Sequence, residues 1–258
     1  MTKAGAIAGH GDSGTEKESS MSEHTVRAFG DQLESLSTSV AQMGGLAETQ
    51  FAEAIEAIAR RDMALADAAI AGDPRIDQLQ QSIEDQAIRV LALRQPMAID
   101  LRDTLAAIKI ASELERVGDL AKNIAKRALV LNREPPIRLT SSLARMGRAT
   151  LSQLKLVLDA YSDRNVAGAE AVWRQDNEID EIYNSLFREL LTYMMEDPRT
   201  IGLCTHLLFV AKNIERCGDH ATNVAETVYH MVSGGHLATE RPKADVTSST
   251  AIPFERKS

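Results

Sequence analysis

The sequence feature that most constrains the fold is an internal repeat with a period of about 100 residues. The segment 115–119 (ERVGD) returns as 215–219 (ERCGD), at a shift of 100 positions. At a shift of 103, Asp73 and Asp77 return as Asp176 and Asp180, and Met43-Gly44 returns as Met146-Gly147. A period of this length indicates that each copy is one supersecondary unit. The chain is therefore predicted to contain two similar units in tandem.

The pattern inside each unit is helical. Apolar residues recur in alternating steps of four and three over 110–131, and 210–231 keep this spacing. No strand pattern competes, and aromatic residues make up only 4% of the chain. Breaks at Asp62, Gln95-Pro96, Glu134-Pro135-Pro136, Asp163 and Asp197-Pro198 divide the middle of the chain. They predict six helices, at about 25–60, 63–94, 96–132, 137–161, 164–196 and 198–233, with Pro74 kinking or interrupting the second.

These helices predict an all-α fold of two tandem three-helix bundles, with long antiparallel helices and different ends. Residues 1–24 are rich in Gly, Ser and Thr and lack apolar periodicity, which predicts a disordered tail. Residues 234–258 contain two prolines and no helical stripe, which predicts a flexible tail. The first repeat unit is then 25–133 and the second is 134–233.

Charge and hydropathy exclude several classes of protein. The chain has 29 basic and 37 acidic residues, a net charge of -8, which argues against nucleic-acid binding and against polybasic attachment to a membrane. No apolar run reaches the ~18 residues of a membrane span, and no signal peptide is evident, so we expect a cytoplasmic protein. Cys204 and Cys217 lie 13 positions apart, too far for a disulfide along one helix.

Acidic pairs stand one residue away from the apolar stripes. They are Asp73 with Asp77 and Glu115 with Asp119 in the first unit, and Asp176 with Asp180 and Glu215 with Asp219 in the second. If the second and third helices of each unit are antiparallel about their turn, the two pairs of that unit lie at the same height. Four carboxylates at one height repel one another unless they are protonated or neutralised. Because carboxylate oxygens bind Mg, Mn, Fe or Zn ions, we predict one metal site in each unit.

Ordinary ion pairing and packing are the alternative explanations for these residues. Arg116, Arg216, Lys122 or Lys126 could neutralise the carboxylates as surface ion pairs. Gly118 and Gly218 each cost about 1 kcal/mol in a helix interior, which indicates either close helix packing or access to the carboxylates. His220 is more typical of a structural or supporting residue than of a ligand. Cys217 and Trp173 are interpreted as core packing.

Three segments resemble the hallmark motifs of the PhoU family, and the resemblance extends over about 25–233. They are 94–102 (RQPMAIDLR), 114–119 (LERVGD) and 214–226 (IERCGDHATNVAE). The resemblance implies paired three-helix bundles that form a homodimer, with Fe, Zn or other divalent ions at the four acidic pairs. It also implies a cytoplasmic negative regulator of the phosphate-starvation response that restrains phosphate uptake. Such a regulator links PstB, the ATPase of the Pst phosphate ABC transporter, to the sensor histidine kinase PhoR, and meets the membrane only through its partners. Pro74, inside the first acidic pair, departs from the pattern.

Three classes of function follow, of which we favour a non-enzymatic adaptor. The alternative is a carboxylate-bridged di-metal oxidoreductase or ferritin-like protein, but such sites use Glu-x-x-His, and the third residues after the two glutamates are Gly118 and Gly218. A membrane-associated scaffold would need a basic amphipathic face, which is absent. The sequence shows no nucleophile triad, phosphate-binding loop or dinucleotide motif, so we do not expect an enzyme.

Overall fold

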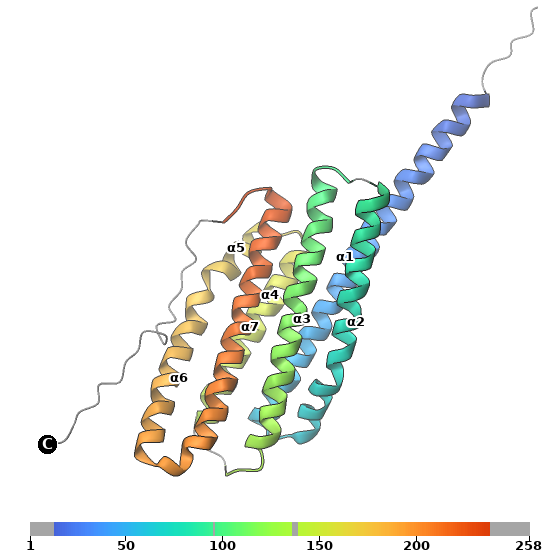
Figure 1. The fold of residues 1–258 in the computed structure, drawn as a ribbon. Coiled ribbons are helices and arrows are strands. Elements are labelled where there is room, and N and C mark those ends of the chain that lie inside the picture. Colours follow the sequence, from blue (N-terminus) through green and yellow to red (C-terminus); the bar gives the residue numbers. More distant parts are fainter. Residues whose placement is uncertain (1–12, 95, 136–138, 238–258) are drawn as a thin grey trace, which may run out of the picture.

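The computed structural model describes residues 13–94, 96–135 and 139–237, and these residues form an all-α fold without strands (Figure 1). The first unit comprises α1 (Ser13–Ala59), α2 (Met63–Arg94) and α3 (Ile99–Leu131). The second comprises α4 (Leu139–Ser162), α5 (Val166–Arg174), α6 (Asp176–Glu196) and α7 (Ile201–Ser233), with a 3₁₀ turn η1 (Pro198–Thr200) before α7. The predicted fold class, two tandem helical units, is confirmed.

The first helix is longer than predicted. It begins at Ser13, so 13–24 continue α1, although they were predicted to be disordered. The sequence of this segment favours helix, because Glu16 and Lys17 have high helix propensity. Residues 1–12 and 238–258 lie outside the described residues, and the prediction of tails there stays a prediction.

Two of the predicted helices, 63–94 and 164–196, differ from those observed, and they do so at nearly equivalent positions of the two repeat copies. The single helix predicted over 164–196 is wrong, because Gln175 separates α5 from α6. Conversely, α2 runs through Pro74 without interruption. The side chain of Gln50 on α1 donates to the Ala69 carbonyl at 2.8 Å, in the turn of α2 before Pro74. Its counterpart Gln153 donates to the carbonyl of Val172 at 3.5 Å, just before the break.

The helices that follow Pro96 and Pro198 begin in different ways. Pro96 is not the first residue of α3, which starts at Ile99 after Ala98 adopts a positive φ of 50°. Pro198 does open a helical turn, and the Asp197 side chain caps that turn by accepting from the Arg199 backbone N–H at 3.1 Å. At the other end of α7, Gly234 takes a left-handed conformation as the C-cap.

Both apolar stripes are buried, and the units pack through α1 against α4 and α3 against α7 (Figure 1). The contact between α1 and α4 is built around two equivalent glycines. A Cβ atom at Gly44 would lie 2.6 Å from Leu158 Cδ2, and one at Gly147 would lie 2.5 Å from Ile55 Cδ1. The repeated Met-Gly therefore marks where the two units approach each other. Among the described residues, no helix combines the length and apolar character needed to cross a membrane.

Candidate functional site

The acidic pairs of the first unit meet across α2 and α3, as the height argument predicts. Lys122 on α3 joins them: its Nζ lies 2.5 Å from Asp73 Oδ2 on α2 and 2.7 Å from Asp119 Oδ1 on its own helix. Asp73 is buried, whereas Asp77, Glu115 and Asp119 are half-buried. The ammonium group of Lys122 therefore stands between carboxylates of the two helices.

In this cluster, four carboxyl groups lie around a single positive charge, the ammonium group of Lys122. Burial, followed by the charge of Asp73, raises the pKa of Asp77 above its ordinary value. Burial, followed by the charges of Asp119 and Asp77, raises the pKa of Glu115. Hydrogen bonds to Asp119 and Asp73 raise the pKa of Lys122, so this lysine stays charged. The cluster thus holds an internal cation that its carboxylates favour.

The second unit arranges the equivalent residues differently. Asp180 and Glu215 are both buried, with 5% of each exposed, and Asp219 is half-buried. Lys212 Nζ lies 2.9 Å from Glu215 Oε2 and 5.0 Å from the centroid of the Tyr183 ring. The side chain of Asp176 lies outside the described residues, although its backbone begins α6. Burial of two carboxylates makes this the deeper of the two clusters.

A residue exchange between the repeats explains part of this difference. The position of Lys122 is occupied in the second unit by Thr222. Its hydroxyl donates to the Gly218 carbonyl at 3.1 Å and accepts from Gln153 Nε2 at 3.2 Å. The second cluster therefore receives its lysine from a different position, three residues before Glu215 rather than three residues after Asp119.

Gly118 and Gly218 allow close packing of helices. A Cβ atom at Gly118 would lie 3.0 Å from Ile76 Cδ1 and 3.1 Å from Gln50 Oε1. One at Gly218 would lie 3.1 Å from the Ile179 Cδ1 atom and 3.3 Å from Gln153 Oε1. The structure thus supports the packing explanation for both glycines. Sequence reasoning missed the two buried glutamines, Gln50 and Gln153. They correspond at a shift of 103 positions, so a comparison of the two copies could have identified them.

A family model described as the PhoU domain matches residues 40–128 and 143–228, one match in each unit. The chain belongs to the PhoU family.

Curated relatives and solved structures of PhoU proteins match nearly the whole described chain. The phosphate-specific transport system accessory protein PhoU homolog of Caulobacter vibrioides (strain NA1000 / CB15N) is 57% identical over 229 residues, 88% of this chain and 100% of that protein. The homolog of Rhizobium meliloti (strain 1021) is 50% identical and covers 88% of this chain and 96% of its own length. The crystal structure of PhoU from Pseudomonas aeruginosa matches with a TM-score of 0.78 and 36% identity, covering 80% of this chain and 100% of that one.

The fit of the PhoU acidic pairs to a metal ion can be tested on their geometry. Their donor chemistry suits a hard divalent cation, since every group is a carboxylate. In the part of the chain that the structure describes, however, no three Asp, Glu, His or Cys side chains are arranged to hold a metal ion. Lys122 and Lys212 contribute the cations that balance these carboxylates. A metal ion at either cluster would therefore have to displace a lysine, and the metal assignment stays a prediction.

The remaining residues singled out in the sequence have structural roles. His220 Nδ1 lies 2.7 Å from Glu113 Oε2 and links α7 to α3, which agrees with its interpretation as a structural residue. Cys217 is buried, and burial raises the pKa of its thiol. Trp173 is buried and its indole N–H donates to Glu226 Oε1 at 3.2 Å. Glu113, which sequence reasoning missed, sits in the contact between the two units.

Proposed function

We propose that this chain is a cytoplasmic regulator of phosphate uptake and a negative regulator of the phosphate-starvation response. The observation that carries the proposal is the full-length match to a phosphate-specific transport system accessory protein at 57% identity. The fold supports the proposal as well, because the structural match covers the full length of a PhoU crystal structure. The role is that of a non-enzymatic accessory protein.

We propose further that it acts as an adaptor between the transporter ATPase PstB and the sensor kinase PhoR, as a homodimer. Exposed apolar side chains at two turns support protein docking. Met97 and Leu93, near the turn between α2 and α3, are 80% and 71% exposed, and Met195, near the turn between α6 and α7, is 63% exposed. These turns lie at opposite ends of the molecule (Figure 1). Exposed apolar residues of this kind are typical of interaction sites, and two separate ones suit an adaptor.

The predicted Fe, Zn, Mn or Mg ions would act on this adaptor through the two acidic clusters. An ion that binds Asp73, Asp77, Glu115 and Asp119 must compete with Lys122, which already neutralises two of them. An ion in the second unit must compete with Lys212 for Glu215. Metal loading is therefore proposed as an exchange of one cation for another.

The regulatory role is tested by alkaline phosphatase activity in phosphate-replete cells that lack the gene. We expect constitutive activity, and we expect a plasmid copy of the full chain to restore repression. Normal repression in the deletion strain would contradict the proposed negative regulation.

The adaptor role is tested by placing a charge on the exposed turn between α2 and α3. The variant Met97→Glu should fail to restore repression, because burying its carboxylate against a partner costs binding free energy. The variant should still fold, because Met97 is 80% exposed. The matched control is Leu156→Glu, where Leu156 is also exposed, at 46%, but belongs to α4 and to neither turn. Equal repression by both variants would show that this turn does not bind a partner.

A further inference from the structure

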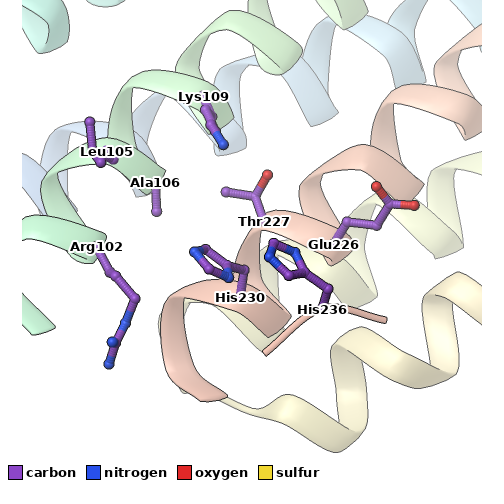
Figure 2. Close-up of a pocket in the computed structure, with 8 residues that line it drawn as sticks. All are labelled: Arg102, Leu105, Ala106, Lys109, Glu226, Thr227, His230 and His236. Atoms are coloured by element: carbon purple, nitrogen blue, oxygen red, sulfur yellow. The ribbon is translucent and has the colours of Figure 1, made fainter. Parts of the chain in front are cut away.

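A cavity of about 210 Å³ lies between the two units, where α3 begins and α7 ends (Figure 2). Its polar lining comes from Arg102 and Lys109 on α3, Glu226, Thr227 and His230 on α7, and His236 just after that helix. The apolar side chains of Leu105 and Ala106 on α3 complete the wall. The cavity is separate from the acidic clusters and plays no part in the proposed adaptor role.

The lining is rich in groups that attract an anion. Arg102 and Lys109 carry positive charge and N–H groups that donate hydrogen bonds. The single carboxylate of the lining, Glu226, accepts a hydrogen bond from the Trp173 indole. In the view of Figure 2, the two imidazole rings lie between Arg102 and Glu226, and the Lys109 amine points toward Thr227. Such a concentration of cationic groups contrasts with the net charge of -8 of the chain.

Several of these side chains are held in place before any ligand arrives. Arg102 Nε donates to the Met231 carbonyl at 3.3 Å. His230 Nδ1 lies 2.9 Å from the carbonyl of Gly235, and because a carbonyl only accepts, Nδ1 carries the proton. The rings of His230 and His236 are stacked, with centroids 4.6 Å apart. Ordered donors of this kind reduce the entropy that is lost when a small ligand binds.

The repeat itself shows that the fold does not require this cavity. At a shift of 100, Lys109 corresponds to Phe209 and Thr227 corresponds to Arg127. There the Arg127 guanidinium lies 4.2 Å from the centroid of the Phe209 ring, and its Nη1 atom is 3.3 Å from His206 Nδ1. The equivalent place at the other end of the α3 and α7 pair is therefore filled by the protein's own side chains. The open cationic cavity is specific to one end.

We propose that this cavity binds inorganic phosphate as its monohydrogen dianion. Its volume is below the roughly 300–1,000 Å³ of pockets for drug-sized ligands, so a small ion fits better than a nucleotide. Arg102 and Lys109 supply charge and hydrogen-bond donors for the phosphate oxygens. The Thr227 hydroxyl donates to the Asn223 carbonyl at 3.0 Å, so toward the cavity it offers lone pairs. Those lone pairs accept from the P–OH group, which sulfate lacks.

The test is isothermal titration calorimetry of the full chain with sodium phosphate, in buffer freed of metal ions so that phosphate bound to a metal does not contribute. We expect one phosphate per chain. The variant Lys109→Gln should bind about tenfold or more weakly, because it loses a charged hydrogen bond. The matched control Lys155→Gln removes the same charge from an exposed position on α4 and should bind like the wild type.

Three further titrations identify the ligand. Sulfate should bind more weakly than phosphate, and Thr227→Val should reduce that preference. Adenosine monophosphate should bind more weakly than phosphate because the cavity is small. Binding of adenosine monophosphate as tight as that of phosphate would overturn the assignment to the free ion in favour of a larger phosphorylated molecule. Absence of phosphate binding at millimolar concentration, or an equal loss in Lys109→Gln and Lys155→Gln, would overturn the site itself.

Discussion

Lys122 shows how one residue sets the state of the first acidic cluster. Its ammonium group contacts Asp73 on one helix and Asp119 on the other, and these contacts keep it charged. The same position in the second unit is Thr222, whose hydroxyl bonds to the backbone and to a glutamine instead. Two copies of one sequence motif therefore reach electrostatic balance in different ways. The difference between Lys122 and Thr222 can be tested by exchanging one residue for the other.

The variant Lys122→Thr copies the second unit into the first. In metal-free protein it should lower the free energy of unfolding by about 1–3 kcal/mol, because buried Asp73 loses its charged partner. Added zinc should restore more stability to this variant than to the wild type, since a bound ion stabilises the folded state and no longer competes with the lysine. Urea unfolding followed by circular dichroism, with chelator and with zinc, measures both effects.

Lys126→Thr is the control for this prediction. Lys126 lies on the same helix, is exposed, and is not among the residues that pair with the cluster. It should change stability by less than about 0.5 kcal/mol, with no response to zinc beyond that of the wild type. Equal zinc responses in all three proteins would contradict the competition between Lys122 and a metal ion.

At the scale of helices, the crossing of α1 and α4 depends on glycines that bring the backbones together. Gly147→Ala should destabilise the protein by about 1–3 kcal/mol, because its new Cβ atom would meet Ile55 at 2.5 Å. Gly45→Ala is the control: a Cβ atom there has nothing within 4 Å, so the variant should gain about 0.5–1 kcal/mol of stability from helix propensity. The midpoint of urea unfolding gives both values.

The double variant Gly147→Ala with Ile55→Ala separates this clash from other effects. Removing the Ile55 side chain frees the space that the new methyl group needs. The double variant should therefore lose less stability than the sum of the losses in the two single variants. Strictly additive losses would show that the loss in Gly147→Ala does not arise from contact with Ile55.

The sequence predicted helices well wherever their signals are local. The apolar stripe over 110–131 and the breaks at Asp62 and Asp197 led to helices close to those observed. The break at Gln175 could not be predicted, because neither glycine nor proline marks it. Pro74 misled in the opposite direction, since the local rule for proline does not include the packing of α2 against α1 and α3.

The site shows the same limit at a longer range. The turns of each unit are visible in the sequence, so the meeting of the pairs of the first unit across α2 and α3 could be predicted from heights alone. The cavity joins Arg102 to His230, which belong to different units. Their proximity depends on how α3 packs against α7, and a repeat does not specify how its copies dock.

At the scale of the whole molecule, the two units are joined by a polar link as well as by apolar packing. Glu113 on α3 accepts hydrogen bonds from His220 Nδ1 at 2.7 Å and Asn223 Nδ2 at 3.0 Å, both on α7. Burial opposes ionisation of Glu113, but these hydrogen bonds and the charges of His220 and Arg116 lower its pKa below the ordinary value of 4.5. The folded protein therefore favours the carboxylate. Its contribution to stability is present above pH 4.5 and is lost as pH falls through the lowered pKa.

Glu113→Gln should weaken this link in a way that depends on pH. At neutral pH the variant should lose about 1–2 kcal/mol in the free energy of unfolding, since neutral hydrogen bonds replace charge-assisted ones. The difference from the wild type should narrow as pH falls below 4.5, because the wild-type carboxylate becomes protonated as well. Glu189→Gln, at an exposed position on α6, should match the wild type throughout. Thermal or urea unfolding across this pH range measures the difference, and one that stays constant with pH would show that the charge of Glu113 does not hold the units together.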